Sequence, residues 1–420
     1  MRIGMFSWES LYSVKVGGVA PHVSELSEAL ARMGHEVHVF TRRGDFDYYD
    51  EINGVHYQRV DHDPTGDIVH QMDTMCDAMV DRFEAVQRIF GRFDVIHGHD
   101  WHPVNAIVRI KKSHGIPMIF TIHSTEWGRN GNSYPQSPVS REISHREWLG
   151  GYESARVIVT TEQMKNELMM LYSIPGEKIE IIPNGIVIGR LRKALDAGRV
   201  KERYGIHPLA PVILFCGRMC YQKGPDLLVR AIPDVLRERW DAKFVFVGDG
   251  DMKWECERLA RELGVEHACR FLGYVPSSTK EDLMNACDII CLPSRNEPFG
   301  VVVLEAWDAG KPVVATEAVT IIKNFEDGLL AYIQPESLAW CIKRLLNNPD
   351  EMKKLSAAAR ARLEHDFSWD KIAEMTVRVY EDVLDQRENP DACPSGRSVS
   401  RLRQSIDAGG IIDRAGSCCP

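Results

Sequence analysis

The N-terminal part of the chain alternates between short apolar runs and one amphipathic segment. Residues 2–7 and 35–41 are apolar runs that predict two β-strands. Between them, residues 21–34 carry apolar side chains at helical spacing and end on Gly34, a residue type that commonly terminates helices. Strand, loop, helix and strand in so short a stretch form a βαβ unit, which predicts a parallel sheet.

The same pattern continues through the first half of the chain. Further strands are predicted over residues 93–97, 116–123, 156–160 and 179–186. Residues 161–171 predict a capped helix after the third of these strands. Residues 124–150 are polar and aromatic with little periodicity, which indicates a long loop and a short helix.

A second sheet is predicted after a charged stretch. Residues 187–210 carry no strong strand signal, so we place the connection between two domains there. The second series of elements comprises strands over residues 211–217, 243–248, 270–274, 288–292 and 312–316, with helices between them. Residues 368–387 predict a long final amphipathic helix, capped by Ser368, that covers an apolar face.

Composition and charge narrow the class of protein. A chain of 420 residues exceeds what one hydrophobic core usually serves, so two domains are expected. The net charge of −9 argues against non-specific nucleic-acid binding. The 11 cysteines follow no regular framework, which favours a reducing, cytoplasmic location. No signal peptide and no apolar run of the ~18 residues that span a bilayer are found, whereas a peripheral membrane contact stays open.

One segment, residues 295–306 (RNEPFGVVVLEA), is the strongest candidate for a binding site. It lies between two apolar runs and predicts a strand, a tight turn and a buried helix start. Gly300 lies just before this helix, where backbone N–H groups can approach an anion closely. Glu297 and Glu305 place one carboxylate on each side of that turn.

Two loops add candidate phosphate contacts. Arg218 and Lys223 follow a strand, and two such cations match a diphosphate, although a solvated surface loop is the alternative. Gly17 and Gly18 precede the first helix, where their N–H groups could face a phosphate or a sugar hydroxyl, with a plain β–α turn as the alternative. Their spacing is not the glycine pattern of dinucleotide-binding proteins.

Histidines gather at the predicted ends of two strands, in residues 97–102 (HGHDWH) and at His123. A metal site is disfavoured because His97 and His99 alternate at strand spacing and no acidic or cysteine cluster completes a zinc set. Polar contacts to a sugar or an acceptor are favoured instead. Histidines that hydrogen-bond to loop carbonyls are the remaining alternative. No metal or other cofactor is therefore predicted.

Six short motifs occur in a characteristic order along residues 1–387. They are Lys15-Val16-Gly17-Gly18, His99-Asp100-Trp101, Thr121-Ile122-His123, Pro183-Asn184-Gly185, Gly217-Arg218 with Lys223-Gly224, and Glu297 with Glu305. Together they resemble the retaining nucleotide-sugar glycosyltransferases of the "glycosyl transferases group 1" superfamily, which includes glycogen synthases and sucrose-phosphate synthases.

The resemblance implies the GT-B fold, an α/β architecture of two Rossmann-like domains with parallel sheets that face each other across a cleft. The implied domains are residues 1–190 on the acceptor side, together with a crossing helix at 368–387, and residues 191–367 on the nucleotide-sugar side. A tail over residues 388–420 is rich in Pro, Ser, Gly and Arg, which predicts disorder.

The resemblance also implies roles for individual residues. The residues implied in catalysis are Arg218, Lys223, Glu297 and His123, with the two cations at the donor diphosphate and Glu297 near the donor sugar. Those implied in donor binding are Lys15, Gly17, Gly18, Phe299, Gly300, Val301 and Glu305, the last of them at the ribose. Those implied on the acceptor or sugar side are His99, Asp100 and Trp101.

The implied activity is the metal-independent transfer of a hexose, with glucose favoured, from a nucleoside-diphosphate sugar to a hydroxyl of a carbohydrate acceptor. The chain departs from the family at Glu317 to Ile321, where a Gly-Gly loop is often found, and at Val187, which replaces a common Asp. The alternatives are a GT-B sugar-nucleotide epimerase, a mannosyltransferase with a small or lipid-linked acceptor, and a catalytically silent binding protein.

Overall fold

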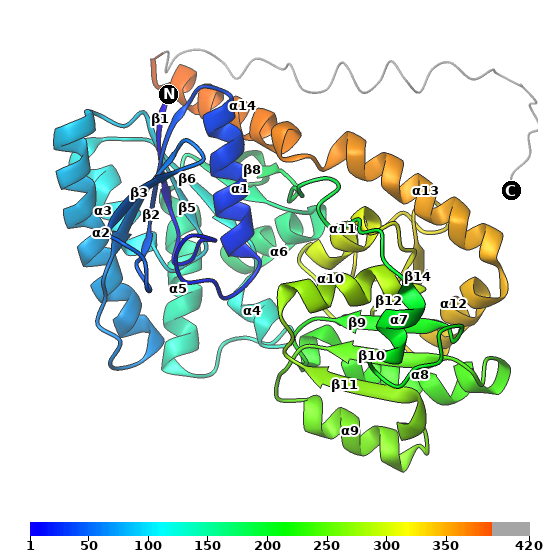
Figure 1. Ribbon diagram of the computed structural model, residues 1–420. Coiled ribbons are helices and arrows are strands. Elements are labelled where there is room, and N and C mark those ends of the chain that lie inside the picture. Colours follow the sequence, from blue (N-terminus) through cyan, green and yellow to red (C-terminus); the bar gives the residue numbers. More distant parts are fainter. Residues whose placement is uncertain (389–420) are drawn as a thin grey trace, which may run out of the picture.

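The computed structural model describes residues 1–388 as two α/β domains, each built on its own sheet (Figure 1). The first sheet has the strand order β3-β4-β2-β1-β5-β6-β7-β8. Its strands are β1 (Arg2–Phe6), β2 (Glu36–Arg42), β3 (Tyr49–Ile52), β4 (Val55–Val60), β5 (Val95–His99), β6 (Met118–Ile122), β7 (Arg156–Val159) and β8 (Ile179–Ile181). All neighbours pair in parallel except β3, which is antiparallel to β4.

The second sheet is fully parallel, with the strand order β11-β10-β9-β12-β13-β14. Its strands are β9 (Val212–Cys216), β10 (Lys243–Val247), β11 (Cys269–Gly273), β12 (Ile289–Leu292), β13 (Val313–Thr316) and β14 (Leu329–Ala331). Parallel sheets need helices on both faces, and apolar clusters accordingly fill both sides of this sheet. The two parallel sheets confirm the predicted fold class.

Helices connect the strands in both domains. Those of the first domain are α1 (Val19–Arg32), α2 (Ile68–Phe90), α3 (Val104–His114), α4 (Glu126–Arg129), α5 (Pro138–Glu153) and α6 (Glu162–Tyr172). Those of the second are α7 (Ala197–Glu202), α8 (Pro225–Glu238), α9 (Lys253–Glu262), α10 (Ser277–Ala286), α11 (Val301–Asp308), α12 (Pro335–Asn347) and α13 (Pro349–Asp366). None of the described helices combines the length and apolar character that crossing a membrane requires.

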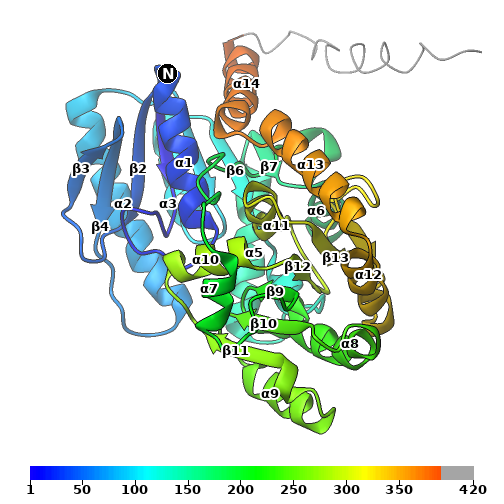
Figure 2. The ribbon, with the colours of Figure 1, turned by 45° about the vertical axis from the view of Figure 1, so that its right-hand side comes forward.

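The last helix, α14 (Trp369–Glu388), returns to the first domain and lies along α1 (Figures 1 and 2). Its apolar stripe joins the core on that side of the sheet, as the amphipathic pattern predicted. The Trp369 indole N–H donates to Glu25 at 2.5 Å, and Arg190 pairs with the same carboxylate at 2.6 Å. Glu25 therefore ties α1 to both the connecting segment and the final helix.

Several details differ from the sequence-based expectations. The first helix spans Val19–Arg32 rather than 21–34, and the segment predicted as a long loop with a short helix contains the 16-residue helix α5. The hairpin β3–β4 and helix α2 lie in a part of the chain for which no elements were predicted. Glu388 ends α14, and the rest of the predicted disordered tail lies outside the described residues.

Candidate functional site

In the second sheet the strands after β9 are added first on one side of it and then, from β12 on, on the other, so the strand order reverses between the neighbours β9 and β12. In open α/β sheets, ligands bind at the carboxyl ends of the strands where this reversal occurs, because the two following loops separate there. The loop after β9 carries Arg218 and Lys223, and the loop after β12 carries Glu297. The topology therefore brings residues that are 74 positions apart to one point.

Lys223 and Glu297 form a direct ion pair at this point. The Lys223 ammonium donates to both carboxylate oxygens, at 2.7 and 2.9 Å, and the Ser294 hydroxyl donates to one of them at 3.0 Å. Only 7% of the Glu297 side chain is exposed, against 25% of Lys223. The lysine is thus the member of the pair that an incoming ligand can reach.

Two glycines shape the loops around this pair. Gly224 has φ +61°, and a Cβ there would lie 2.1 Å from the carbonyl oxygen of Pro293, so the two loops could not pack so closely with any other residue. Gly300 has φ +92° and precedes α11 directly. The first amides of a helix lack intrahelical acceptors and attract anions. Phe299 is buried, and the partly buried Val301 opens the helix.

Glu305 on α11 has a partner that the sequence did not reveal. Lys280 on α10 donates to its carboxylate at 2.6 Å. Burial alone would lower the pKa of Lys280, but the neighbouring Glu305 raises it above its ordinary value. No motif marks this lysine, because the contact depends on the packing of two helices. Arg218, in contrast, is exposed and forms no ion pair with any carboxylate of residues 1–388.

The first sheet has its own reversal, between β1 and β5. The loop after β1 contains the exposed residues Lys15 to Gly18. The buried carboxylate of Glu9 accepts hydrogen bonds from the backbone N–H groups of Val16 at 2.5 Å and Gly17 at 2.8 Å. Burial raises the pKa of Glu9, and these two hydrogen bonds oppose that effect. Sequence reasoning missed Glu9, which holds the glycine loop in place.

The loops after β5 and β6 meet at the same end of the first sheet. Asp100 adopts φ +57° and accepts a hydrogen bond from the His123 N–H at 2.8 Å. Burial raises the pKa of Asp100 to about 6. Burial also lowers the pKa of His123, to about 4. His99 is fully buried, and Trp101 is 4% exposed within the core, so His123 offers the most accessible side chain of this group.

Residues 296–298 of the second domain contact the first domain directly. The hydroxyls of Thr160 and Thr161, just after β7, donate to the Pro298 carbonyl at 3.3 and 3.0 Å. The Asn296 amide donates to the Asn132 side chain at 2.7 Å. The loops at the carboxyl ends of the two sheets therefore meet at residues 296–298.

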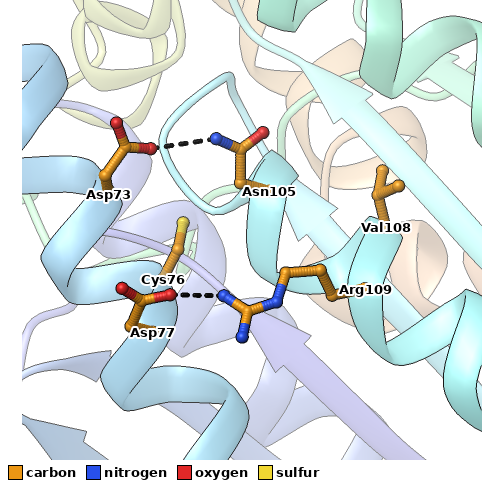
Figure 3. A pocket seen from close by; sticks show the side chains of 6 residues that line it. All are labelled: Asp73, Cys76, Asp77, Asn105, Val108 and Arg109. Atoms are coloured by element: carbon orange, nitrogen blue, oxygen red, sulfur yellow. Dashed lines mark hydrogen bonds and ion pairs between the residues drawn. The ribbon is translucent and has the colours of Figure 1, made fainter.

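A separate pocket of about 370 Å³ lies between α2 and α3, away from these loops (Figure 3). Its polar side chains are already engaged with one another: Asn105 donates to Asp73 at 2.9 Å, and Arg109 pairs with Asp77. None of the residues predicted from the sequence as site residues lines it. We therefore do not regard this pocket as the functional site.

Comparison with solved structures defines the class of protein. Sucrose-phosphate synthase from Thermosynechococcus elongatus superposes with a TM-score of 0.76 at 23% identity, over 91% of this chain and 99% of that one. Anabaena HepE in complex with UDP-glucose superposes with a TM-score of 0.71 at 19% identity, over 91% and 99%. The chain thus has the GT-B fold of glycosyltransferases.

Comparison with known sequences identifies the family. The profile of "Glycosyl transferases group 1" matches residues 198–362, and that of "Glycosyltransferase Family 4" matches residues 16–190. An uncharacterized glycosyltransferase of Methanocaldococcus jannaschii is 37% identical over 90% of this chain and 98% of its own length. Glycogen synthase of Mycobacterium tuberculosis is 30% identical over 90% and 94%. The chain belongs to the group 1 glycosyltransferases, as its motifs predicted.

Proposed function

We propose that the chain transfers a hexose, with glucose favoured, from a nucleoside-diphosphate sugar to a hydroxyl of a carbohydrate acceptor, with retention of anomeric configuration and without a catalytic metal. The observation that supports this proposal best is the Lys223–Glu297 pair at the reversal point of the second sheet. In this pair the partly exposed Lys223 ammonium lies near the N-terminus of α11, which Gly300 precedes, and a diphosphate would bind there.

In the proposed transfer, the protein has to stabilise the negative charge that develops on the leaving diphosphate, and it forms no covalent bond with the sugar. When the bond between the anomeric carbon and the diphosphate oxygen breaks, its electron pair goes to the leaving diphosphate. Preorganised cations that meet this developing charge are each worth about 3 kcal/mol. The acceptor oxygen then attacks on the face that the diphosphate leaves, and its proton passes to a phosphate oxygen. This course accounts for retention without a protein nucleophile.

We assign roles to the side chains according to where they lie. Lys223 would exchange part of its contact with Glu297 for a donor phosphate oxygen, and the exposed Arg218 would approach the same group. Glu297, released in part, would accept a hydroxyl of the donor sugar. Glu305 would receive the ribose hydroxyls, with Lys280 holding its carboxylate in place.

The first domain would complete the site from the opposite side. His123 would contact the sugar near the reacting carbon, with its backbone fixed by Asp100. The loop of Lys15 to Gly18 would close over the donor. The Gly17 N–H already donates to Glu9, so Gly18 and Lys15 are the members of this loop that contact the donor directly. Gly17 would contact the donor only if its hydrogen bond to Glu9 broke on binding.

The donor class can be tested with a thermal-shift panel of nucleoside diphosphates and nucleotide sugars. A ligand at 100 times its Kd raises the free energy of unfolding by about 2.7 kcal/mol. HepE was solved with UDP-glucose, so UDP-glucose heads the panel. The anomeric configuration of the product, read by NMR, then tests retention.

Three variants test the assigned roles. Lys223→Ala and Arg218→Ala should chiefly lower kcat, by about 10²-fold or more, because they remove charge at the leaving group. Glu305→Ala should chiefly weaken nucleotide binding. Lys343→Ala is the matched control, because it removes a lysine ion pair outside the site. If all three site variants changed only donor affinity, the leaving-group role of the cations would be wrong.

A second candidate differs in the acceptor. D-inositol 3-phosphate glycosyltransferase of Frankia alni is 30% identical over 88% of this chain, close to the value for glycogen synthase. A small phosphorylated acceptor is therefore to be compared with glucan oligomers in the transfer assay. Incubation with donor alone separates both candidates from an epimerase, which would convert the donor without an acceptor.

A further inference from the structure

Three histidines from separate parts of the first domain converge beside the proposed sugar site. His22 lies in the first turns of α1, His99 ends β5, and His123 follows β6. One ring nitrogen from each lies within 4.8 Å of those of the other two. The pair His99 Nδ1 and His123 Nε2 is 3.4 Å apart. Sequence reasoning grouped His123 with the histidines at 97–102 but did not consider His22, which completes this set.

The hydrogen bonds of the cluster are incomplete. His22 Nε2 and His99 Nε2 are buried and have no partner among the described residues. The adjacent His97 provides a contrast, because its two ring nitrogens contact Tyr380 Oη and Thr121 Oγ1, each at 2.7 Å. His97 is therefore a satisfied core histidine. The Nε2 of His22 is therefore available to a ligand that the protein itself does not supply, whereas His99 faces His123 through Nδ1.

The geometry suits a tetrahedral metal ion. Imidazole nitrogens bind Zn²⁺ at about 2.0–2.1 Å, which places two ligand nitrogens about 3.4 Å apart. The His99–His123 pair already has this spacing, and since all separations in the cluster are within 4.8 Å, none needs to close by more than about 1.4 Å. His22 Nδ1 lies 2.8 Å from the Asn184 side-chain oxygen, the kind of outer contact that orients a metal-bound histidine.

We propose that His22, His99 and His123 form a binding site for one divalent transition-metal ion of the Zn²⁺ type, with the fourth position left to solvent or substrate. Imidazole ligands suit Zn²⁺, Co²⁺, Ni²⁺ and Cu²⁺ and discriminate against Mg²⁺ and Ca²⁺. The metal takes no part in the transfer. A bound metal would coordinate His123, the side chain assigned to the donor sugar, and would therefore inhibit the transfer. The inhibition, unlike the binding, rests on the proposed function.

Binding is tested without reference to activity by titrating the full chain, made without a polyhistidine tag, with Co²⁺. Cys393, Cys418 and Cys419 are replaced by serine in every sample, so that thiols near the C-terminus cannot contribute. We expect one equivalent of Co²⁺ to produce the intense visible bands of tetrahedral coordination, and Zn²⁺ to remove them by competition. Mg²⁺ should have no effect.

Two variants assign the signal to this cluster. His22→Asn keeps a side-chain N–H for Asn184 but removes Nε2, and should weaken Co²⁺ affinity by 100-fold or more. Asn184→Ala keeps all three ligands and should weaken it by about 10- to 100-fold. His365→Asn, an exposed histidine elsewhere, is the control and should leave the titration unchanged. Absence of a one-to-one tetrahedral signal, or a signal that survives in His22→Asn, overturns the metal site.

Inhibition is measured separately. Zn²⁺ should lower the transfer rate in competition with the donor, and His22→Asn should become insensitive to Zn²⁺. If Co²⁺ binds as expected but no transfer activity is found with any donor, the metal site stands and the proposed function fails. If Co²⁺ binds and transfer proceeds unaffected by Zn²⁺, the overlap between the metal and the donor sugar is wrong.

Discussion

The Lys223–Glu297 pair allows a quantitative test of how the site is built. Lys223→Met removes the ammonium and leaves the Glu297 carboxylate, 7% exposed, with the Ser294 hydroxyl as its only side-chain donor within residues 1–388. Breaking a buried ion pair from one side costs about 3–5 kcal/mol, because the remaining charge stays buried without compensation. Since a quarter of Lys223 is exposed, water can partly replace it, and we expect the lower end, about 3 kcal/mol.

The double variant should be more stable than this single variant. Glu297→Gln alone should cost about 1–2 kcal/mol, because the lysine that remains can turn toward water. In Lys223→Met/Glu297→Gln no charge is buried, so the total should fall to about 2 kcal/mol, which corresponds to a coupling energy of about 2–3 kcal/mol. The second substitution would thus restore stability that the first removed.

The assay is urea unfolding of the full chain for the wild type, both single variants and the double variant, without donor. The exposed pair Arg258–Glu262, with side chains 43% and 52% exposed, serves as a control cycle and should couple by less than about 0.5 kcal/mol. Additive effects in the Lys223–Glu297 cycle would show that the two charges do not interact in the free protein. The picture of a pair that opens to admit a donor phosphate would then be refuted.

Three other predictions concern different parts of the molecule. Gly224→Ala should lower the free energy of unfolding, measured in urea, by about 3 kcal/mol or more, because its Cβ would lie 2.1 Å from a carbonyl oxygen. The control Gly264→Ala, at φ +69° with open space around it, should cost only about 1 kcal/mol. Equal losses in the two variants would contradict this. Burial lowers the pKa of His38 to about 4, so the unfolded chain binds one more proton than the folded one between pH 6.5 and 4, and stability falls as the pH falls. From pH 7 to 5 the wild type should therefore lose about 2 kcal/mol more than His38→Gln, and parallel pH profiles would refute this. Lys280→Met should raise the Kd for the nucleotide about 10-fold with little change in kcat, because Glu305 loses its anchor; an effect on kcat alone would exclude this positioning role.

Local sequence was sufficient for much of the fold. Residues 211–217 read as a buried strand and form β9, and Gly300 was placed before a helix that begins at Val301. The ordered motifs were sufficient for the family, which the relatives confirm. Both kinds of signal are contained in short stretches of chain. Where such a stretch was weakly periodic, as around α5, the sequence indicated a long loop with only a short helix, although tertiary packing stabilises a helix of 16 residues.

The partners of the site residues were decided by tertiary structure alone. Lys223 meets Glu297 because β9 and β12 are neighbours in the second sheet, and Lys280 meets Glu305 because α10 packs near α11. His22 reaches the other two histidines only because the start of α1 lies at the carboxyl ends of β5 and β6. These contacts depend on strand order and helix packing, which no local pattern encodes. The sequence by itself determined which side chains are available for the chemistry. The three-dimensional fold decided which of them act together, because only folding brings residues that are distant in the chain within bonding distance.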